Sequence, residues 1–145
     1  MDYSTPWLVR TERAIASAYE SSAYFEYYKD DLFGILDSRP ATLFEMNVLI
    51  LNYFLRKIGI SADLRMTEEY VPARSREIPV ETGRYGTDYR ELIHPKRPDN
   101  ILRDLRLEKP YFQVFAGKYG FVPNLSIMDL LFNEGPDSIS YLKNL

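Results

Sequence analysis

The pattern of hydrophobic and polar residues predicts helices over the first part of the chain. Apolar positions recur at helical spacing over residues 6–20, where Thr5 stands at the N-cap position and a proline follows. A second apolar face extends to about residue 37, after two serines suited to capping, Ser21 and Ser22. We therefore expect two consecutive helices, the second ending just before an Arg-Pro pair, because the residue preceding a proline resists helical backbone angles.

The next segment carries the strongest local signal. Thr42 and Glu45 fit a capping box that opens an apolar helix, which runs to Ile58 and ends at a glycine. Apolar residues surround this helix almost completely, so we expect it to be central in the fold. Asn47 and Asn52 are its conspicuous interior polar groups. We expect a structural role for Asn52, since a buried amide most often satisfies neighbouring backbone groups, and leave the role of Asn47 open.

The second half of the chain has shorter signals. Alternating residues over 61–67 predict a strand, and prolines and glycines around 72–87 predict a mobile or binding loop. A short helix is expected over 99–105, and the aromatic stretch 110–115 fits either a strand or a helical turn. A serine cap at residue 126 opens the first of two short final helices. The sequence thus predicts a single domain, 1–145, with a mainly helical α+β fold of about five helices and one small strand element.

Composition narrows the classes of function. The chain of 145 residues has no cysteine, which excludes disulfides, thiolate nucleophiles and Cys-ligated metal sites and favours the reducing cytoplasm. A net charge of −3 gives no general attraction to nucleic acid or to anionic membrane surfaces. No apolar run approaches the roughly 20 residues of a bilayer span. We expect no nucleic-acid partner and no membrane insertion.

His94 is the single histidine, which excludes catalytic triads and two-histidine metal sites, and we expect no metal or other cofactor. It lies in a segment where aromatic, basic and acidic residues converge, including Arg90 and Lys96. Such a segment suits an anionic ligand, with the imidazole as general acid or base. The alternative is a solvated loop whose histidine caps a carbonyl group.

Other polar residues have simpler explanations. Gln113 precedes a glycine-containing segment that permits close approach of a ligand but matches no phosphate-binding motif. Asp129 occupies the third position of a predicted helix, where the helix dipole already favours an acid. The aromatic run over residues 24–28 suits stacking on bases or sugars, although core packing and a subunit contact explain it equally.

Several segments, spread over nearly the whole chain, together resemble the WbqC-like family, particularly its Bacteroides-type members. They are AY at 18–19, AYFEYY at 23–28, MN at 46–47, YRELIHPK at 89–96, PYFQVF at 110–115 and FVPNLSIMDLLFNEGP at 121–136. The last of these motifs is long and specific.

The resemblance implies a role in O-antigen or capsule biosynthesis, with a glycine- or acyl-type transfer to an amino sugar as the suggested reaction. Family members are typically longer, so this chain corresponds to a C-terminal portion, possibly of a larger α/β protein. Members also carry a histidine shortly after the tryptophan that Trp7 resembles, where this sequence has Thr11.

Two hypotheses follow. In the first, the protein is a transferase acting on a sugar-linked small molecule: His94 is the acid or base, Arg90 and Lys96 bind a phosphate or carboxylate, and Gln113 and Asn47 orient the substrate. In the second, it is a non-catalytic module, or an inactive fragment, that forms a homodimer or binds another protein of the pathway through aromatic residues.

Overall fold

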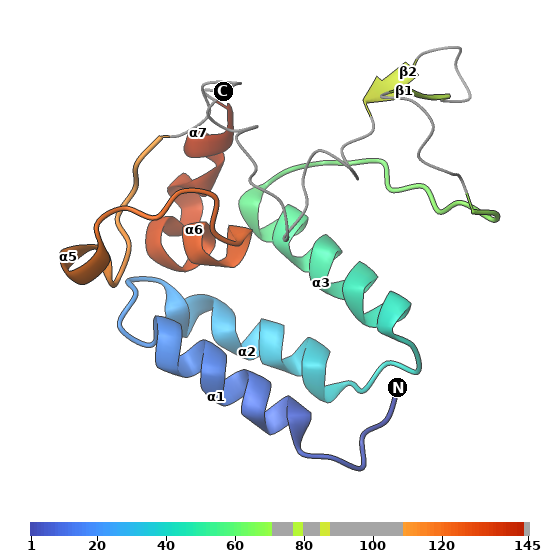
Figure 1. Ribbon diagram of the computed structural model, residues 1–145, viewed down its shortest axis with the longest axis horizontal. Coiled ribbons are helices and arrows are strands. Elements are labelled where there is room, and N and C mark those ends of the chain that lie inside the picture. Colours follow the sequence, from blue (N-terminus) through green and yellow to red (C-terminus); the bar gives the residue numbers. More distant parts are fainter. Residues whose placement is uncertain (71–76, 80–84, 88–108, 144–145) are drawn as a thin grey trace. The chain divides into compact units, whose positions relative to one another are not determined.

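The structure, a computed structural model, describes residues 1–70, 77–79, 85–87 and 109–143. The chain divides into two compact units, Met1–Ala62 with Lys109–Leu145, and Asp63–Glu108. The first unit is helical, and Figure 1 shows its helices. The mainly helical character predicted from the sequence is confirmed.

Helices α1 (Trp7–Tyr19) and α2 (Phe25–Asp37) pack against each other, as the apolar spacing predicted. Their predicted caps were wrong. Pro6 occupies the N-cap of α1 and Tyr24 that of α2, and neither helix start has a side-chain cap. Ser22 instead donates its hydroxyl to the Tyr19 carbonyl at 2.6 Å, so it serves the end of α1. The turn between the helices is therefore longer than the sequence suggested.

Helix α3 (Leu43–Ile58) has the ends that the sequence predicted. Thr42 Oγ1 accepts the Glu45 backbone N–H at 3.1 Å, and the Glu45 carboxylate accepts the Thr42 N–H at 3.1 Å, so the capping box is complete. Gly59 ends the helix at φ 84°, a left-handed conformation that suits glycine. The helix contacts α2 and α6.

The C-terminal segment contains three helices. Residues 110–113 have no regular secondary structure and lead through a turn into the short helix α5 (Ala116–Tyr119), so the strand alternative for residues 110–115 was wrong. Ser126 caps α6 (Ile127–Glu134), accepting the Met128 N–H at 3.3 Å. A 3₁₀ turn (Gly135–Asp137) then leads into α7 (Ser138–Lys143), in agreement with the two predicted final helices.

The core of this unit forms where α2, α3 and α6 meet. Its buried residues are Phe25, Leu32, Tyr53, Phe54, Ile58, Leu131 and Phe132. Phe25 and Phe132 pack edge to face, with ring centroids 5.3 Å apart. Tyr53 satisfies its buried hydroxyl by donating to the Tyr28 carbonyl at 2.7 Å. A smaller cluster of Leu8, Leu36 and Met46 joins the other ends of α1, α2 and α3.

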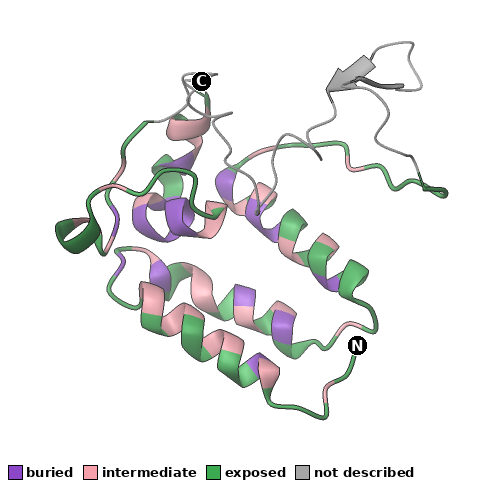
Figure 2. Ribbon diagram, in the orientation of Figure 1, coloured by how far each residue is buried: buried purple, intermediate pink, exposed green. Residues whose placement is uncertain are grey.

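Helix α3 contributes residues to both core clusters, in agreement with its predicted central position, but several of its positions are exposed (Figure 2). Asn47 and Asn52 both lie on exposed positions. The burial expected for Asn52 was therefore wrong, but its expected structural role is confirmed, because its amide donates to the Val48 carbonyl one turn earlier at 2.9 Å.

The second unit contains a short antiparallel pair of strands. β1 (Glu77–Pro79) pairs with β2 (Tyr85–Thr87), with Ile78 opposite Gly86. The strand predicted over 61–67 was wrong, since no regular secondary structure occurs there. Much of the predicted loop 72–87 and all of the predicted helix 99–105 lie outside the described residues.

Candidate functional site

The structure describes two of the five residues predicted to form a site. His94, Arg90 and Lys96 lie outside the described residues, so their roles stay predictions. Asn47 lies on the exposed side of α3, whereas Gln113 is 4% exposed. Asn47 does not line the pocket that contains Gln113.

Gln113 joins the two chain segments that lie before and after α5. Its Nε2 donates to the Val122 carbonyl at 2.9 Å, and its Oε1 accepts the Val122 N–H at 2.9 Å. The side-chain amide thus pairs with a backbone peptide in the manner of a β-ladder. Nε2 also lies 3.4 Å from Oδ2 of Asp129. This residue therefore fixes the loop and connects it to α6.

Asp129 is the residue that the sequence analysis undervalued. It lies in the first turn of α6, as expected for an acid, but it is only 5% exposed. Its Oδ2 accepts the Tyr111 hydroxyl at 2.6 Å, and its backbone carbonyl accepts Nδ2 of Asn133 at 2.8 Å. A buried carboxylate needs such donors, because an unpaired buried charge is costly. The helix dipole explains the sequence position of this acid but not its burial.

The tyrosines beside Asp129 remain protonated over a wide pH range. Burial raises the pKa of Tyr111 well above its usual value, and the hydrogen bond to Asp129 raises it further. Burial also raises the pKa of Tyr19, with Asp129 again adding to the effect. Both hydroxyls can therefore donate protons in hydrogen bonds to the carboxylate at physiological pH.

A pocket opens beside this polar cluster, with a volume of about 160 Å³. Its lining residues are Ala18, Gln113, Val114, Phe115, Tyr119, Gly120, Val122, Leu125 and Asp129. The side chains of Phe115 and Tyr119 are 51% and 65% exposed, so their rings form accessible walls, whereas the amide and the carboxylate are buried. The pocket thus combines accessible aromatic rings with a fixed acceptor, and its volume is below the roughly 300–1,000 Å³ of drug-sized sites.

The pocket is suited to a small ligand with hydrogen-bond donors. Asp129 offers carboxylate lone pairs, and Oε1 of Gln113 retains a second lone pair beyond its bond to Val122. The aromatic walls suit the apolar face of a sugar ring or a cation. Sequence reasoning named Gln113 but did not connect it with Asp129, because the two residues are 16 positions apart and only the fold brings them together.

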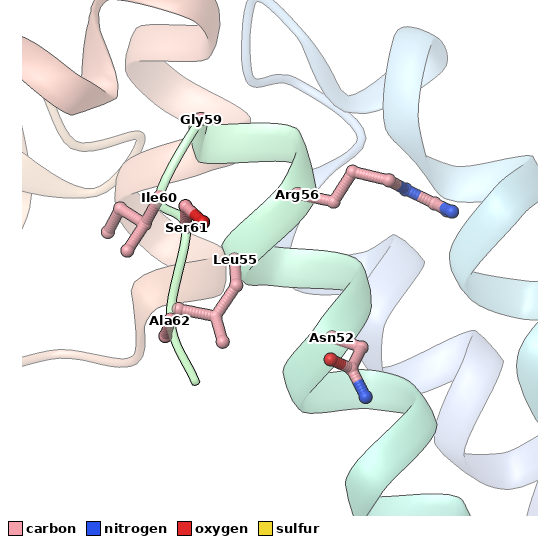
Figure 3. A pocket seen from close by; sticks show the side chains of 7 residues that line it. All are labelled: Asn52, Leu55, Arg56, Gly59, Ile60, Ser61 and Ala62. Atoms are coloured by element: carbon pink, nitrogen blue, oxygen red, sulfur yellow. The ribbon is translucent and has the colours of Figure 1, made fainter. Parts of the chain in front are cut away.

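A second hollow, of about 360 Å³, lies at the end of α3 (Figure 3). It is lined by Asn52, Leu55, Arg56, Gly59, Ile60, Ser61 and Ala62. Its lining mixes apolar residues such as Leu55 with polar ones, and the Asn52 amide already donates to the backbone. None of its three polar side chains, Asn52, Arg56 and Ser61, is buried. It therefore lacks the fixed, buried polar groups of the Asp129 pocket.

Within the described ranges, no three His, Asp or Glu side chains cluster closely enough to hold a metal ion. None of the helices described is both long and apolar enough to cross a membrane.

Comparison with known proteins identifies a family. The sequence matches the WbqC-like protein family over residues 1–141. Comparisons with curated proteins and with solved structures found no match. The family resemblance seen in the sequence motifs is thus confirmed, whereas the Bacteroides-type subgroup and the correspondence to a C-terminal portion stay predictions.

Proposed function

Because this chain belongs to the WbqC-like protein family, we propose that it acts in the cytoplasm on a sugar-linked intermediate of bacterial surface-polysaccharide biosynthesis. The proposed reaction is a glycine- or acyl-type transfer to an amino sugar. Family membership supports the pathway. The single observation that supports the ligand class is the buried Asp129 carboxylate at the base of a small pocket with aromatic walls.

An amino sugar fits the chemistry of this pocket. Its ammonium or amine group donates hydrogen bonds to the Asp129 carboxylate, and a charge-assisted bond of this kind is about twice as strong as a neutral one. The ring packs against Phe115 or Tyr119, which are the exposed aromatic residues of the lining. The volume of about 160 Å³ favours one sugar ring over a larger ligand.

The transfer itself requires a base near the amine. The amine nitrogen attacks the acyl carbonyl carbon, the bond to the leaving group breaks, and a base takes the amine proton. His94 is the proposed base, and Arg90 and Lys96 are proposed to bind the phosphate or carboxylate of the substrate. Gln113 orients the ligand through its remaining lone pair, and Asn47 stays a proposed contact to a more distant part of the substrate.

Isothermal titration calorimetry tests the ligand assignment. D-glucosamine and UDP-glucosamine are titrated into the wild type, with glucose as the ligand that lacks the amine. We expect the amine-bearing ligands to bind at least tenfold more tightly than glucose. Asp129→Asn should remove that preference, because the amide keeps the shape but loses the charge.

Asp137→Asn is the matched control, since Asp137 is exposed and does not line the pocket. Circular dichroism establishes that each variant is folded. Equal affinity of the wild type and Asp129→Asn for glucosamine, or equal affinity of the wild type for glucose and glucosamine, would contradict the proposal.

The second candidate function is a non-catalytic interaction module. The aromatic run at residues 24–28 gives it little support, because Phe25 is buried in the core and only Tyr27 is largely exposed. The observation that favours it is the exposed apolar side of α3, which carries Phe44 at 60% and Leu51 at 47% exposure. A protein that binds no sugar ligand but associates through α3 would fit this candidate.

A further inference from the structure

Helix α3 has two apolar sides, and the part of the chain that the structure describes covers one of them. Its buried residues are Met46, Tyr53, Phe54 and Ile58, which face α2 and α6. Away from these residues, Phe44 and Leu51 are 60% and 47% exposed, and Figure 2 shows the exposed positions along the helix in green. Exposed apolar positions aligned along one helix are suited to contact with a partner.

The exposed side has the spacing of a helix-pairing surface. Phe44, Val48, Leu51 and Leu55 follow one another at intervals of four, three and four residues, which is the repeat of a coiled-coil seam. We call these four residues the α3 seam. An apolar groove of about 400 Å³ lies beside its first half, lined by Ser38, Pro40, Phe44, Glu45, Val48 and Leu49. Side chains from a facing helix can fill such a groove.

We propose that the α3 seam binds the same seam of a second copy of this chain, with the two helices antiparallel about a two-fold axis. The seam is symmetric about its centre, which lies between Leu49 and Ile50. In the antiparallel pair Phe44 therefore lies opposite the partner's Leu55, and Val48 opposite the partner's Leu51. An isologous contact of this kind is the commonest way in which identical chains associate.

The charges at the two ends of the helix select this direction. At about 100° per residue, Glu45 and Arg56 project on the same flank of the seam. The two-fold axis places Glu45 of one copy within about 3 Å, along the helix axis, of the level of the partner's Arg56. Lys57, the other basic residue in the last turn of α3, is already paired with Asp31 at 2.5 Å. In a parallel pair the two copies of this flank would lie on opposite sides of the seam, so Glu45 would not face the partner's Arg56.

This proposal does not depend on the ligand of the Asp129 pocket, because none of the four seam residues lines that pocket. A protein that fails to bind amino sugars can still dimerise through α3. The two proposals therefore fail separately.

Sedimentation velocity over a range of concentrations tests the dimer. We expect the wild type to shift from monomer to dimer as concentration rises, and Leu51→Glu to weaken the dimer at least a hundredfold, because two carboxylates then meet near the two-fold axis. Tyr27→Glu is the matched control, since Tyr27 is 81% exposed on α2 and lies outside the seam. A wild type that stays monomeric, or a dimer that Leu51→Glu leaves unchanged, overturns the proposal.

Cysteine cross-linking tests whether the two α3 helices are antiparallel. Because the chain has no native cysteine, only the introduced cysteines can form disulfides. Phe44→Cys mixed with Leu55→Cys should form a disulfide-linked heterodimer under mild oxidation. Phe44→Cys alone should not cross-link, because its two copies would lie about 16 Å apart along the helix axis. The reverse result, with Phe44→Cys alone cross-linking efficiently, indicates a parallel pair and overturns the antiparallel arrangement.

Discussion

The Tyr111 hydroxyl donates a 2.6 Å hydrogen bond to Oδ2 of Asp129, across 18 residues of sequence. The bond joins an irregular segment to the first turn of α6. Gln113 makes a second, longer contact with the same oxygen at 3.4 Å. The segment before α5 is thus held to α6 by side chains rather than by secondary structure, and the pocket depends on these contacts.

Replacing Tyr111 by Phe should destabilise the fold while leaving its aromatic packing largely intact. The ring still packs edge to face on Phe121 at 5.5 Å and on Tyr141 at 5.9 Å. The buried carboxylate loses its shortest hydrogen bond, so we expect a loss of about 1–3 kcal/mol in the free energy of unfolding. Urea denaturation measures it. An unchanged midpoint would show that the bond contributes nothing to stability.

The protein should lose stability as the pH rises above about 10. Burial raises the pKa of Tyr53 and of Tyr111 in the folded state, with the charges of Asp31 and Asp129 adding to the respective effects. Above the ordinary tyrosine pKa of about 10, the unfolded chain releases these protons while the folded chain keeps them. The stabilising contribution is therefore complete below pH 10 and is lost as the pH rises further.

Urea denaturation between pH 8 and pH 11 measures this loss. The variant with both Tyr53→Phe and Tyr111→Phe should show a shallower decline in stability than the wild type across the upper part of that range. Parallel declines in the two proteins would assign the alkaline loss to other groups.

Short-range sequence signals predicted the helices well. Features that depend on contacts between distant residues were predicted less well. The capping box of Thr42 and Glu45 is contained in four residues, so the sequence showed it directly. The failed strand at residues 61–67 shows the opposite case, because alternation favours a strand but gives it no partner to pair with. The burial of Asn52 was wrongly predicted for a related reason. An apolar helix suggests burial, but which of its sides is exposed depends on the elements that pack against it.

The candidate site was predictable only in part. Gln113 was singled out by its neighbourhood, but its partners Val122 and Asp129 are nine and sixteen residues away. The loop that joins them has no periodicity from which this pairing follows. Asp129 looked like an ordinary acid in a first helical turn, and its burial comes from the docking of Tyr111.

Gln113 should matter for stability far more than Asn47, although both are amides proposed to contact a ligand. Gln113→Ala removes both hydrogen bonds that the buried Gln113 side chain makes with the Val122 backbone, which should cost about 1–3 kcal/mol. Asn47→Ala changes an exposed position on α3 and should stay within about 0.5 kcal/mol of the wild type. Thermal denaturation compares the two variants, and equal losses would contradict the assigned roles.

Thr42→Ala should cost about 1 kcal/mol, because it removes the hydroxyl that accepts the Glu45 N–H at the start of α3. Glu45→Gln is the matched variant, since glutamine also completes a capping box. We expect Glu45→Gln to retain most of the stability in urea denaturation. A loss as large as that of Thr42→Ala would show that the charge of Glu45, rather than its hydrogen bond, stabilises the helix.

Gly135→Ala should be among the more damaging small substitutions in the chain. Gly135 adopts φ 54° at the end of α6, and a Cβ atom there would lie 2.6 Å from the Tyr24 ring. The backbone that carries this ring is held to α6, because the Tyr24 N–H donates to the Phe132 carbonyl at 2.9 Å. Relief of the overlap therefore requires movement of α6 against the start of α2, and overpacking of this kind costs about 1–3 kcal/mol.

Gly120→Ala separates the overlap from the backbone strain. Gly120 also has positive φ, at 71°, but a Cβ atom there would meet nothing within 4 Å. Both variants carry the strain of a left-handed alanine, whereas only Gly135→Ala collides with an aromatic ring. We expect the midpoint of urea denaturation to fall further for Gly135→Ala than for Gly120→Ala. Equal falls would mean that strain alone explains both and that the Tyr24 ring moves aside freely.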